Sequence, residues 1–142
     1  KLSGSSIVTV NKEIDGFILN RLQGALLNEA MRLYSEGYAS SEDIDATIKD
    51  GLGLRWAFMG PFETIDLNAP GGIKDYMARY GSIFIEMAKS QTKIPDWSEN
   101  AGKKLELERR KVLSEDDLEK RAKKRNFLLK QLRKLKIDND ET

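Results

Sequence analysis

One long apolar stretch, residues 13 to 36, most constrains what this chain can fold into. On a helical wheel its first half is apolar on nearly every side, whereas its second half is apolar on one side only. We therefore predict a central helix whose first half is enclosed on both sides. At a rise of about 1.5 Å per residue this helix would be roughly 35 Å long, close to the diameter of a small domain. Gly37 is predicted to end it.

Asn20 is a polar, uncharged residue in the middle of the apolar half of this stretch. Asparagine disfavours helix slightly, and a buried amide without a partner costs roughly 1–3 kcal/mol. Two interpretations follow from the residues alone. Asn20 is either a core asparagine bonded to a neighbouring carbonyl, which is the commoner case, or a rigidly held group that binds a substrate oxygen.

The remainder of the chain is predicted to be helical as well. Serines at positions 40 and 114 and the proline at position 61 are typical of helix starts. Helical spacing and breaks predict further helices over residues 41–50, 61–68, 73–90, 98–113 and 115–136. Residues 6–10 are rich in β-branched side chains and predict one short strand. The expected fold class is all-α with that single strand, which is either an ordered tail or part of a sheet encoded upstream.

Residues 51–60 are predicted to form a loop and are the most site-like part of the chain, because they combine two glycines with aromatic side chains and a cation. The guanidinium of Arg55 could bind a carboxylate or phosphate through paired hydrogen bonds. The alternative is a surface arginine stacked on Trp56. The Gly51-x-Gly53 pair is not a dinucleotide motif, since it follows a helix and lacks the third glycine.

The composition excludes several function classes. The 142 residues include no cysteine and no histidine, which removes the usual zinc ligands and the commonest general base, so no metal site is expected. The net charge of +1 gives no general attraction to nucleic acid or membrane. Residues 103–136 combine many basic side chains with leucines at helical spacing. This pattern favours an amphipathic helix whose basic face is exposed to solvent over a nucleic-acid-binding surface. A cytoplasmic protein that binds neither nucleic acid nor membrane is expected.

Several motifs resemble a known family. Residues 13–22, EIDGFILNRL, resemble the GF(I/V)xNR helix that opens the C-terminal domain of 3-hydroxyacyl-CoA dehydrogenases, and the similarity continues through residues 28–30, 41–45 and 59–63. Residues 50–58 and 67–69 are most similar to the lambda-crystallin or L-gulonate 3-dehydrogenase branch of that family.

The resemblance implies a helical C-terminal domain of the 6-phosphogluconate-dehydrogenase-like type, spanning residues 12–137 and followed by an acidic disordered tail at 138–142. Residues 1–11 would be the last strand and linker of an upstream Rossmann domain that binds NAD and carries the missing histidine base. The chain, which opens on Lys1, would then be the second half of an enzyme, inactive alone and forming a homodimer.

By the same resemblance, Asn20 inherits a catalytic role and holds the reacting oxygen of a hydroxy-acid substrate. Arg55 and Trp56 are expected to bind that substrate, most closely L-gulonate oxidised at C3. A 3-hydroxyacyl-CoA or carnitine dehydrogenase domain, and a non-catalytic structural dimer of the crystallin kind, are the alternatives.

Overall fold

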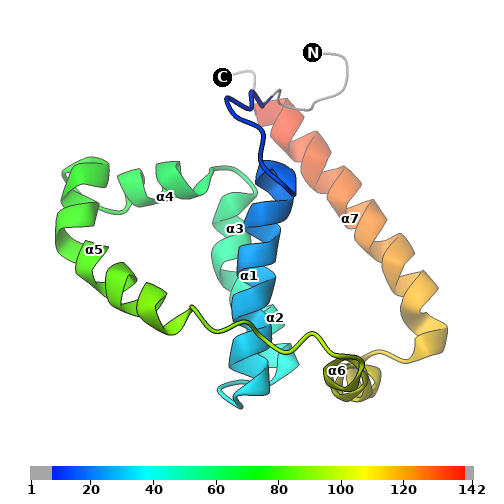
Figure 1. Cartoon of the computed structure of the whole chain (residues 1–142). Helices are drawn as coiled ribbons and strands as arrows, with labels where there is room; N and C mark the ends of the chain where they lie inside the picture. The colour runs from blue at the N-terminus through cyan, green and yellow to red at the C-terminus, as the bar shows by residue number, and fades with distance from the viewer. Residues whose placement is uncertain (1–7, 140–142) are drawn as a thin grey trace. The chain divides into compact units, whose positions relative to one another are not determined.

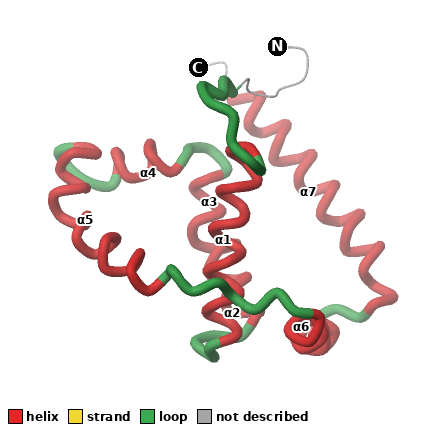
Figure 2. The backbone as a smooth tube through the Cα atoms, in the orientation of Figure 1, coloured by secondary structure: helices red, strands yellow, loops and turns green. Residues whose placement is uncertain are grey.

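The computed structural model describes residues 8–139. In this range it contains helices and loops only, as Figures 1 and 2 show, which confirms the all-α prediction. The elements are α1 Phe17–Ser35, α2 Ser41–Ala46, the π-helix η1 Thr47–Leu52, α3 Gly53–Trp56, α4 Pro61–Leu67, α5 Gly72–Ser90, α6 Glu99–Val112, the 3₁₀ turn η2 Glu115–Asp117 and α7 Leu118–Asn139. Of the strand expected at residues 6–10, residues 8–10 show no regular structure, and residues 6 and 7 lie outside the described range.

The described chain divides into two compact units. The central unit is Ala25–Gly102, and the terminal unit consists of residues 8–24 together with 103–139. Every buried residue of the described range belongs to the central unit; these residues are Met31, Ser41, Thr64, Ala69 and Ala101. The central unit therefore has a small core of its own, whereas the described part of the terminal unit has no buried residue.

The first helix begins later than predicted. Gly16 has a φ of +81°, and the N–H of Phe17 donates to the carbonyl oxygen of Ile14 at 3.1 Å, so residues 14–17 form a turn and α1 starts at Phe17. A glycine at the third position is what a type II turn requires. The expected enclosure of the first half of the helix is wrong for this chain by itself, since Leu19 is 74% and Leu22 60% exposed.

The predicted end of α1 at Gly37 is confirmed. Gly37 has a φ of +79°, its N–H donates to the carbonyl of Tyr34, and the N–H of Tyr38 donates to the carbonyl of Leu33 at 2.9 Å. These two bonds are the Schellman arrangement, which satisfies the last carbonyls of a helix and needs a left-handed residue. Glycine supplies that conformation without steric cost.

The loop predicted over residues 51–60 is wrong for its first six residues. The chain continues without a break from α2 through the π-helix η1 into α3, so residues 51–56 are helical. The N–H of Gly53 donates to the carbonyl oxygen of Ile48, five residues earlier. A Cβ added to Gly53 would lie only 2.9 Å from that oxygen. Gly53 therefore permits the wider π turn, and it does not break the helix as its type suggested.

The predicted break after residue 68 is confirmed and leads into α5. The carboxylate of Asp66 accepts the N–H of Ile73 at 2.6 Å, and that of Asp75 accepts the N–H of Gly71 at 3.1 Å. These acidic groups satisfy free donors at the start of a helix, where negative charge is favourable. The helix α5 packs on α4, as Figure 1 shows on one side of the central unit.

The C-terminal helices follow the predicted pattern with one addition. The hydroxyl of Ser114 donates to the Asp117 carboxylate at 3.0 Å, and a 3₁₀ turn precedes α7. The helix α7 then runs to Asn139, so it includes two residues expected in the acidic tail. The remaining tail residues lie outside the described range.

Candidate functional site

Asn20 lies in the first turn of α1, in the terminal unit. Its side chain is exposed and makes no hydrogen bond with any residue of the described range 8–139. Asn20 is therefore not a core asparagine satisfied by a neighbouring carbonyl. A rigid helix presents an amide with its donors and its acceptor available, which is the arrangement needed to hold a ligand oxygen. The catalytic role of Asn20 stays a prediction.

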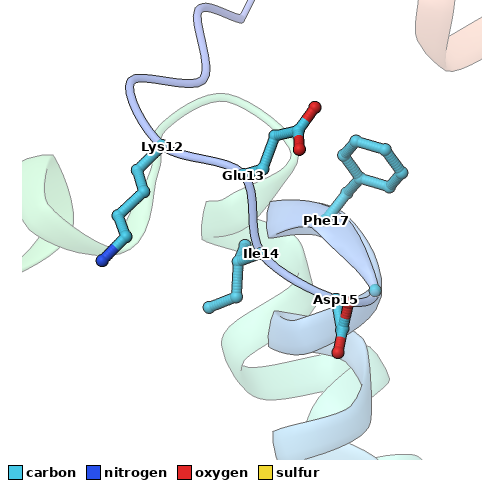
Figure 3. Close-up of a pocket in the computed structure, with 6 residues that line it drawn as sticks. Lys12, Glu13, Ile14, Asp15 and Phe17 are labelled. Carbon is cyan, nitrogen blue, oxygen red and sulfur yellow. The ribbon is translucent and has the colours of Figure 1, made fainter.

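The segment before α1 forms an open hollow of about 750 Å³, drawn in Figure 3. That volume is within the usual range of small-molecule sites, roughly 300–1,000 Å³. Its lining residues are Lys12, Glu13, Ile14, Asp15, Gly16 and Phe17. A Cβ added to Gly16 would be 3.8 Å from the Cβ of Asn20, so the Asn20 side chain lies beside the turn that lines the hollow. Sequence reasoning missed this hollow, although an Asp-Gly pair before an apolar run is a turn signal.

Arg55 and Trp56 lie in α3, in the central unit, and not in a loop. Arg55 is exposed and forms no ion pair or hydrogen bond through its side chain within the described range, and Trp56 is 40% exposed. Consecutive residues of a helix do not face each other. Consistently, the described residues show no stacking of Arg55 on Trp56, so the guanidinium remains available to an anion.

A polar cluster on the second half of α1 was not predicted. Arg32 bonds Glu29 at 2.6 Å and Glu36 at 3.0 Å, and its guanidinium carbon lies 5.8 Å from the ring centroid of Tyr38. The hydrogen bond from Arg32 is the largest effect on the pKa of Glu29 and holds it below its ordinary value; burial opposes this effect, and a hydrogen bond from Gln91 lowers the pKa further. The bond with Glu29 also raises the pKa of Arg32. Spacings of three and four residues bring these charges together on one helix face.

The connector between α5 and α6 is joined to this cluster. The indole N–H of Trp97 donates to Oδ1 of Asn28 at 3.0 Å, and the ammonium of Lys93 lies 3.4 Å from the Glu36 carboxylate. Figure 1 shows the connector crossing the C-terminal end of α1. Since every charge of the cluster is already paired within the chain, we interpret the cluster as a structural element that fixes the connector.

The described residues offer no cofactor or metal site of a familiar kind. Residues 8–139 contain no strand–turn–helix unit for a dinucleotide and no group of three or more acidic or histidine ligands suited to a metal ion. Within the same range, none of the helices has the length and apolar character to cross a bilayer. The expected cytoplasmic location stays a prediction.

Comparison with known proteins identifies the family. Residues 16–115 match the model of the 3-hydroxyacyl-CoA dehydrogenase, C-terminal domain, and this region includes Asn20, Arg55 and Trp56. The chain belongs to this family of helical dehydrogenase domains, as the GF(I/V)xNR resemblance predicted.

Individual relatives fit the same assignment. Lambda-crystallin of Oryctolagus cuniculus is 44% identical over 135 residues, which cover 94% of this chain and 42% of that protein. The L-carnitine dehydrogenase of Streptomyces coelicolor is 43% identical over 82 residues, or 57% of this chain and 26% of that protein. A 3-hydroxyacyl-CoA dehydrogenase of Gibberella moniliformis is 34% identical over 133 residues, or 91% of this chain and 41% of that protein. The chain thus spans less than half the length of these relatives.

Proposed function

We propose that this chain is the substrate-binding and dimerisation half of an NAD-dependent dehydrogenase that oxidises the hydroxyl group of a 3-hydroxy acid. The observation that carries the proposal is the exposed, unpartnered amide of Asn20, held on α1 inside the family-matched region. The activity is assigned to a longer protein, because the described residues form no dinucleotide site. The upstream half would bind NAD and carry the general base.

Asn20 would act on the oxygen of the reacting carbon. Its amide N–H donates to the substrate hydroxyl oxygen and keeps that hydrogen bond as the oxygen becomes a carbonyl. A fixed donor at such an atom typically contributes about 100- to 1,000-fold to kcat. NAD, when bound upstream, supplies the hydride acceptor for a reaction of this class. The part of the chemistry assigned to this chain is the orientation of the oxygen.

The substrate proposed first is L-gulonate, oxidised at C3 to 3-dehydro-L-gulonate. A sugar acid carries a carboxylate near the reacting hydroxyl, and the available guanidinium of Arg55 can bind a carboxylate at two points. An acyl-CoA thioester has no carboxylate at that position, so it would not benefit from Arg55. Arg55 therefore favours a hydroxy acid over a thioester.

L-Carnitine is the second candidate substrate. One relative of this chain is an L-carnitine dehydrogenase, and carnitine combines a carboxylate with a quaternary ammonium group. The exposed ring of Trp56, the residue after Arg55 in α3, favours this alternative, since tryptophan is the best aromatic partner of a cation. In this alternative Arg55 would bind the carboxylate, and Trp56 the quaternary ammonium group.

We further propose a homodimer, with the exposed apolar side chains of α1 and α5 at its interface. In α5, Met77, Ile83 and Ile85 are 63%, 53% and 62% exposed, and no residue of this helix is buried. Apolar surface of this extent is unfavourable in water and is typical of a protein–protein contact. Light scattering at micromolar concentration should give twice the 16.1 kDa mass of the chain, and a mass of 16.1 kDa would contradict the dimer.

The test of the function uses the dehydrogenase that carries this chain, assayed with NAD and L-gulonate, L-carnitine or 3-hydroxybutyryl-CoA. Asn20→Ala should lower kcat roughly 100- to 1,000-fold and leave the helical content unchanged. Asn28→Ala is the matched control, because Asn28 lies on the same helix but is bonded to Trp97. Unchanged turnover in Asn20→Ala would remove the catalytic assignment.

Arg55→Leu tests the substrate class. It should raise KM for L-gulonate or carnitine roughly 10- to 100-fold, which is the range expected when a hydrogen bond to a charged group is lost. KM for 3-hydroxybutyryl-CoA should not change. Equal losses on acid and thioester would contradict the anchor. If the unaltered protein turns over none of the three substrates, the non-catalytic crystallin-like alternative is favoured.

A further inference from the structure

We infer that Phe17 is a substrate-contacting residue, whose ring forms the apolar wall of the hollow before α1, against which the carbon chain of the hydroxy acid lies while Asn20 holds its oxygen. The inference rests on the proposed dehydrogenase function. It adds to that function a specificity-determining side chain for which neither the GF(I/V)xNR resemblance nor the family match assigns a role.

The backbone conformation of Phe17 is the first observation. Its φ is +49°, and no other residue in the described range 8–139 apart from glycine has a positive φ. Side chains with a Cβ disfavour this left-handed region, and a bulky aromatic residue there is an outlier. Residues held in such conformations occur disproportionately at ligand sites, where the surroundings impose an unfavourable geometry that function requires.

The exposure of the ring is the second observation. Phe17 is 65% exposed, and its ring makes no aromatic contact with another residue of the described range. Burial of the ring in this chain therefore does not explain why Phe17 adopts a left-handed conformation. In Figure 3 the ring projects away from the start of α1, toward the same side as Glu13. A ligand in the hollow would cover it.

The third observation is the position of Phe17 and its turn relative to Asn20. Phe17 is the first residue of α1, and Asn20 lies in the same first turn of that helix. The turn before Phe17 lies beside the same asparagine, since a Cβ added to Gly16 would be 3.8 Å from the Asn20 Cβ and 3.7 Å from Cγ of Arg21. A small molecule in the hollow, which Gly16 and Phe17 both line, would therefore lie against the turn that is next to Asn20.

The experiment separates the ring from its backbone conformation. Phe17→Asn removes the ring but suits the left-handed region, which asparagine tolerates. In the 142-residue chain this variant should unfold at a urea midpoint no lower than that of the unaltered chain. In the dehydrogenase it should raise KM for L-gulonate or carnitine roughly 10- to 100-fold, as expected for the loss of one buried aromatic contact. Binding of NADH should not change, and Phe17→Tyr should restore KM.

Phe127→Asn is the matched control, because Phe127 is 60% exposed in the regular helix α7 and should leave KM unchanged. An unchanged KM in Phe17→Asn would overturn the inference, as would a lowered urea midpoint or a weakened affinity for NADH. Any of these outcomes would leave the proposed function unaffected, provided that the unaltered enzyme oxidises at least one of the three substrates. Absence of turnover by the unaltered enzyme on all three substrates would overturn the function and this inference together.

Discussion

The two halves of α1 share one helical geometry but differ in how the chain holds them. Residues 25–35 contain the buried Met31 and the paired Arg32, and their neighbour Trp97 fixes a connector to them. Residues 17–24 contain large apolar side chains that stay exposed and an amide without a partner. The second half stabilises this chain, whereas we interpret the first half as a surface for a substrate and a second subunit. Substitutions in the second half should therefore lower the stability of the chain, whereas substitutions in the first half should affect assembly and substrate binding.

The largest effect on stability is expected at Met31, which is 7% exposed. Met31→Ala removes buried methylene groups and leaves a cavity, which should lower the free energy of unfolding by about 2–5 kcal/mol. Leu19→Ala, at a side chain that is 74% exposed in the other half, should change it by no more than about 0.5 kcal/mol. Urea unfolding of both variants, at a concentration where the chain is monomeric, measures the difference. Equal losses would contradict the division of α1.

Leu22→Asp should have the largest effect on assembly. Leu22 is 60% exposed, and placing it in a dimer interface would stabilise the dimer by roughly 2 kcal/mol. The aspartate should therefore raise the dimer dissociation constant at least about 30-fold, since 1.4 kcal/mol corresponds to a factor of ten. Analytical ultracentrifugation measures that constant. The same experiment on Asn28→Asp, in the second half of α1, should show a smaller change.

Arg32→Leu should give an intermediate loss of stability. The substitution removes two ion pairs and leaves Glu29, whose side chain is 27% exposed, without its cation. A partly buried carboxylate that loses its cation is destabilising. We expect the melting temperature to fall by roughly 5 °C. Circular dichroism measures it, and Arg21→Leu in the first half of α1 is the matched control. A larger fall in Arg21→Leu than in Arg32→Leu would reverse the comparison.

Trp97→Phe should have a smaller effect, because it keeps most of the ring and removes only the N–H that donates to Asn28. A single hydrogen bond at an exposed site contributes about 0.5 kcal/mol or slightly more. The change should appear as a lower urea midpoint with an unchanged denaturant slope. A changed slope would mean that the connector bond also determines how compact the native or unfolded chain is.

The sequence predicts helix ends better than it predicts what covers a helix. The end of α1 at Gly37 and the start of α4 at Pro61 follow from local chemistry, since each needs only its neighbours. The π turn at Gly53 was not predicted, because glycine commonly ends helices. The close approach of Gly53 to the Ile48 carbonyl exists only once the π turn has formed, so it leaves no signal in the local sequence. The left-handed conformation of Phe17 could not be predicted, because phenylalanine has no preference for a positive φ.

The apolar character of residues 17–24 was visible in the sequence, but its partner was not. The apolar face of a helix is normally buried against another surface. The spacing of its apolar residues is the same whether that surface belongs to this chain or to a second molecule. Asn20 illustrates the same limit. Its type and position suggested a site through the family resemblance, whereas its exposure and its place beside the Gly16 turn depend on how the chain folds before α1.

The smallest effect expected is a pH dependence confined to the second half of α1. The pKa of Glu29 lies below its ordinary value of 4.5 in the folded chain, first because of its hydrogen bond with Arg32. The folded state therefore binds fewer protons than the unfolded state in this range, and stability falls as the pH falls. The contribution of Glu29 is fully present above about pH 4.5 and is lost as the pH falls through the lowered pKa.

Glu29→Gln isolates this contribution. The variant should be less stable than the unaltered chain at neutral pH, and the gap between their urea midpoints should close as the solution is acidified. Asp75, whose pKa is lowered by Arg79 and by the Gly71 N–H, titrates in both proteins and cancels from the difference. A gap that stays constant with pH would mean that Glu29 acts through packing and not through its charge. Because Arg32 is the main cause of the shift, Arg32→Leu should flatten the profile in the same way as Glu29→Gln.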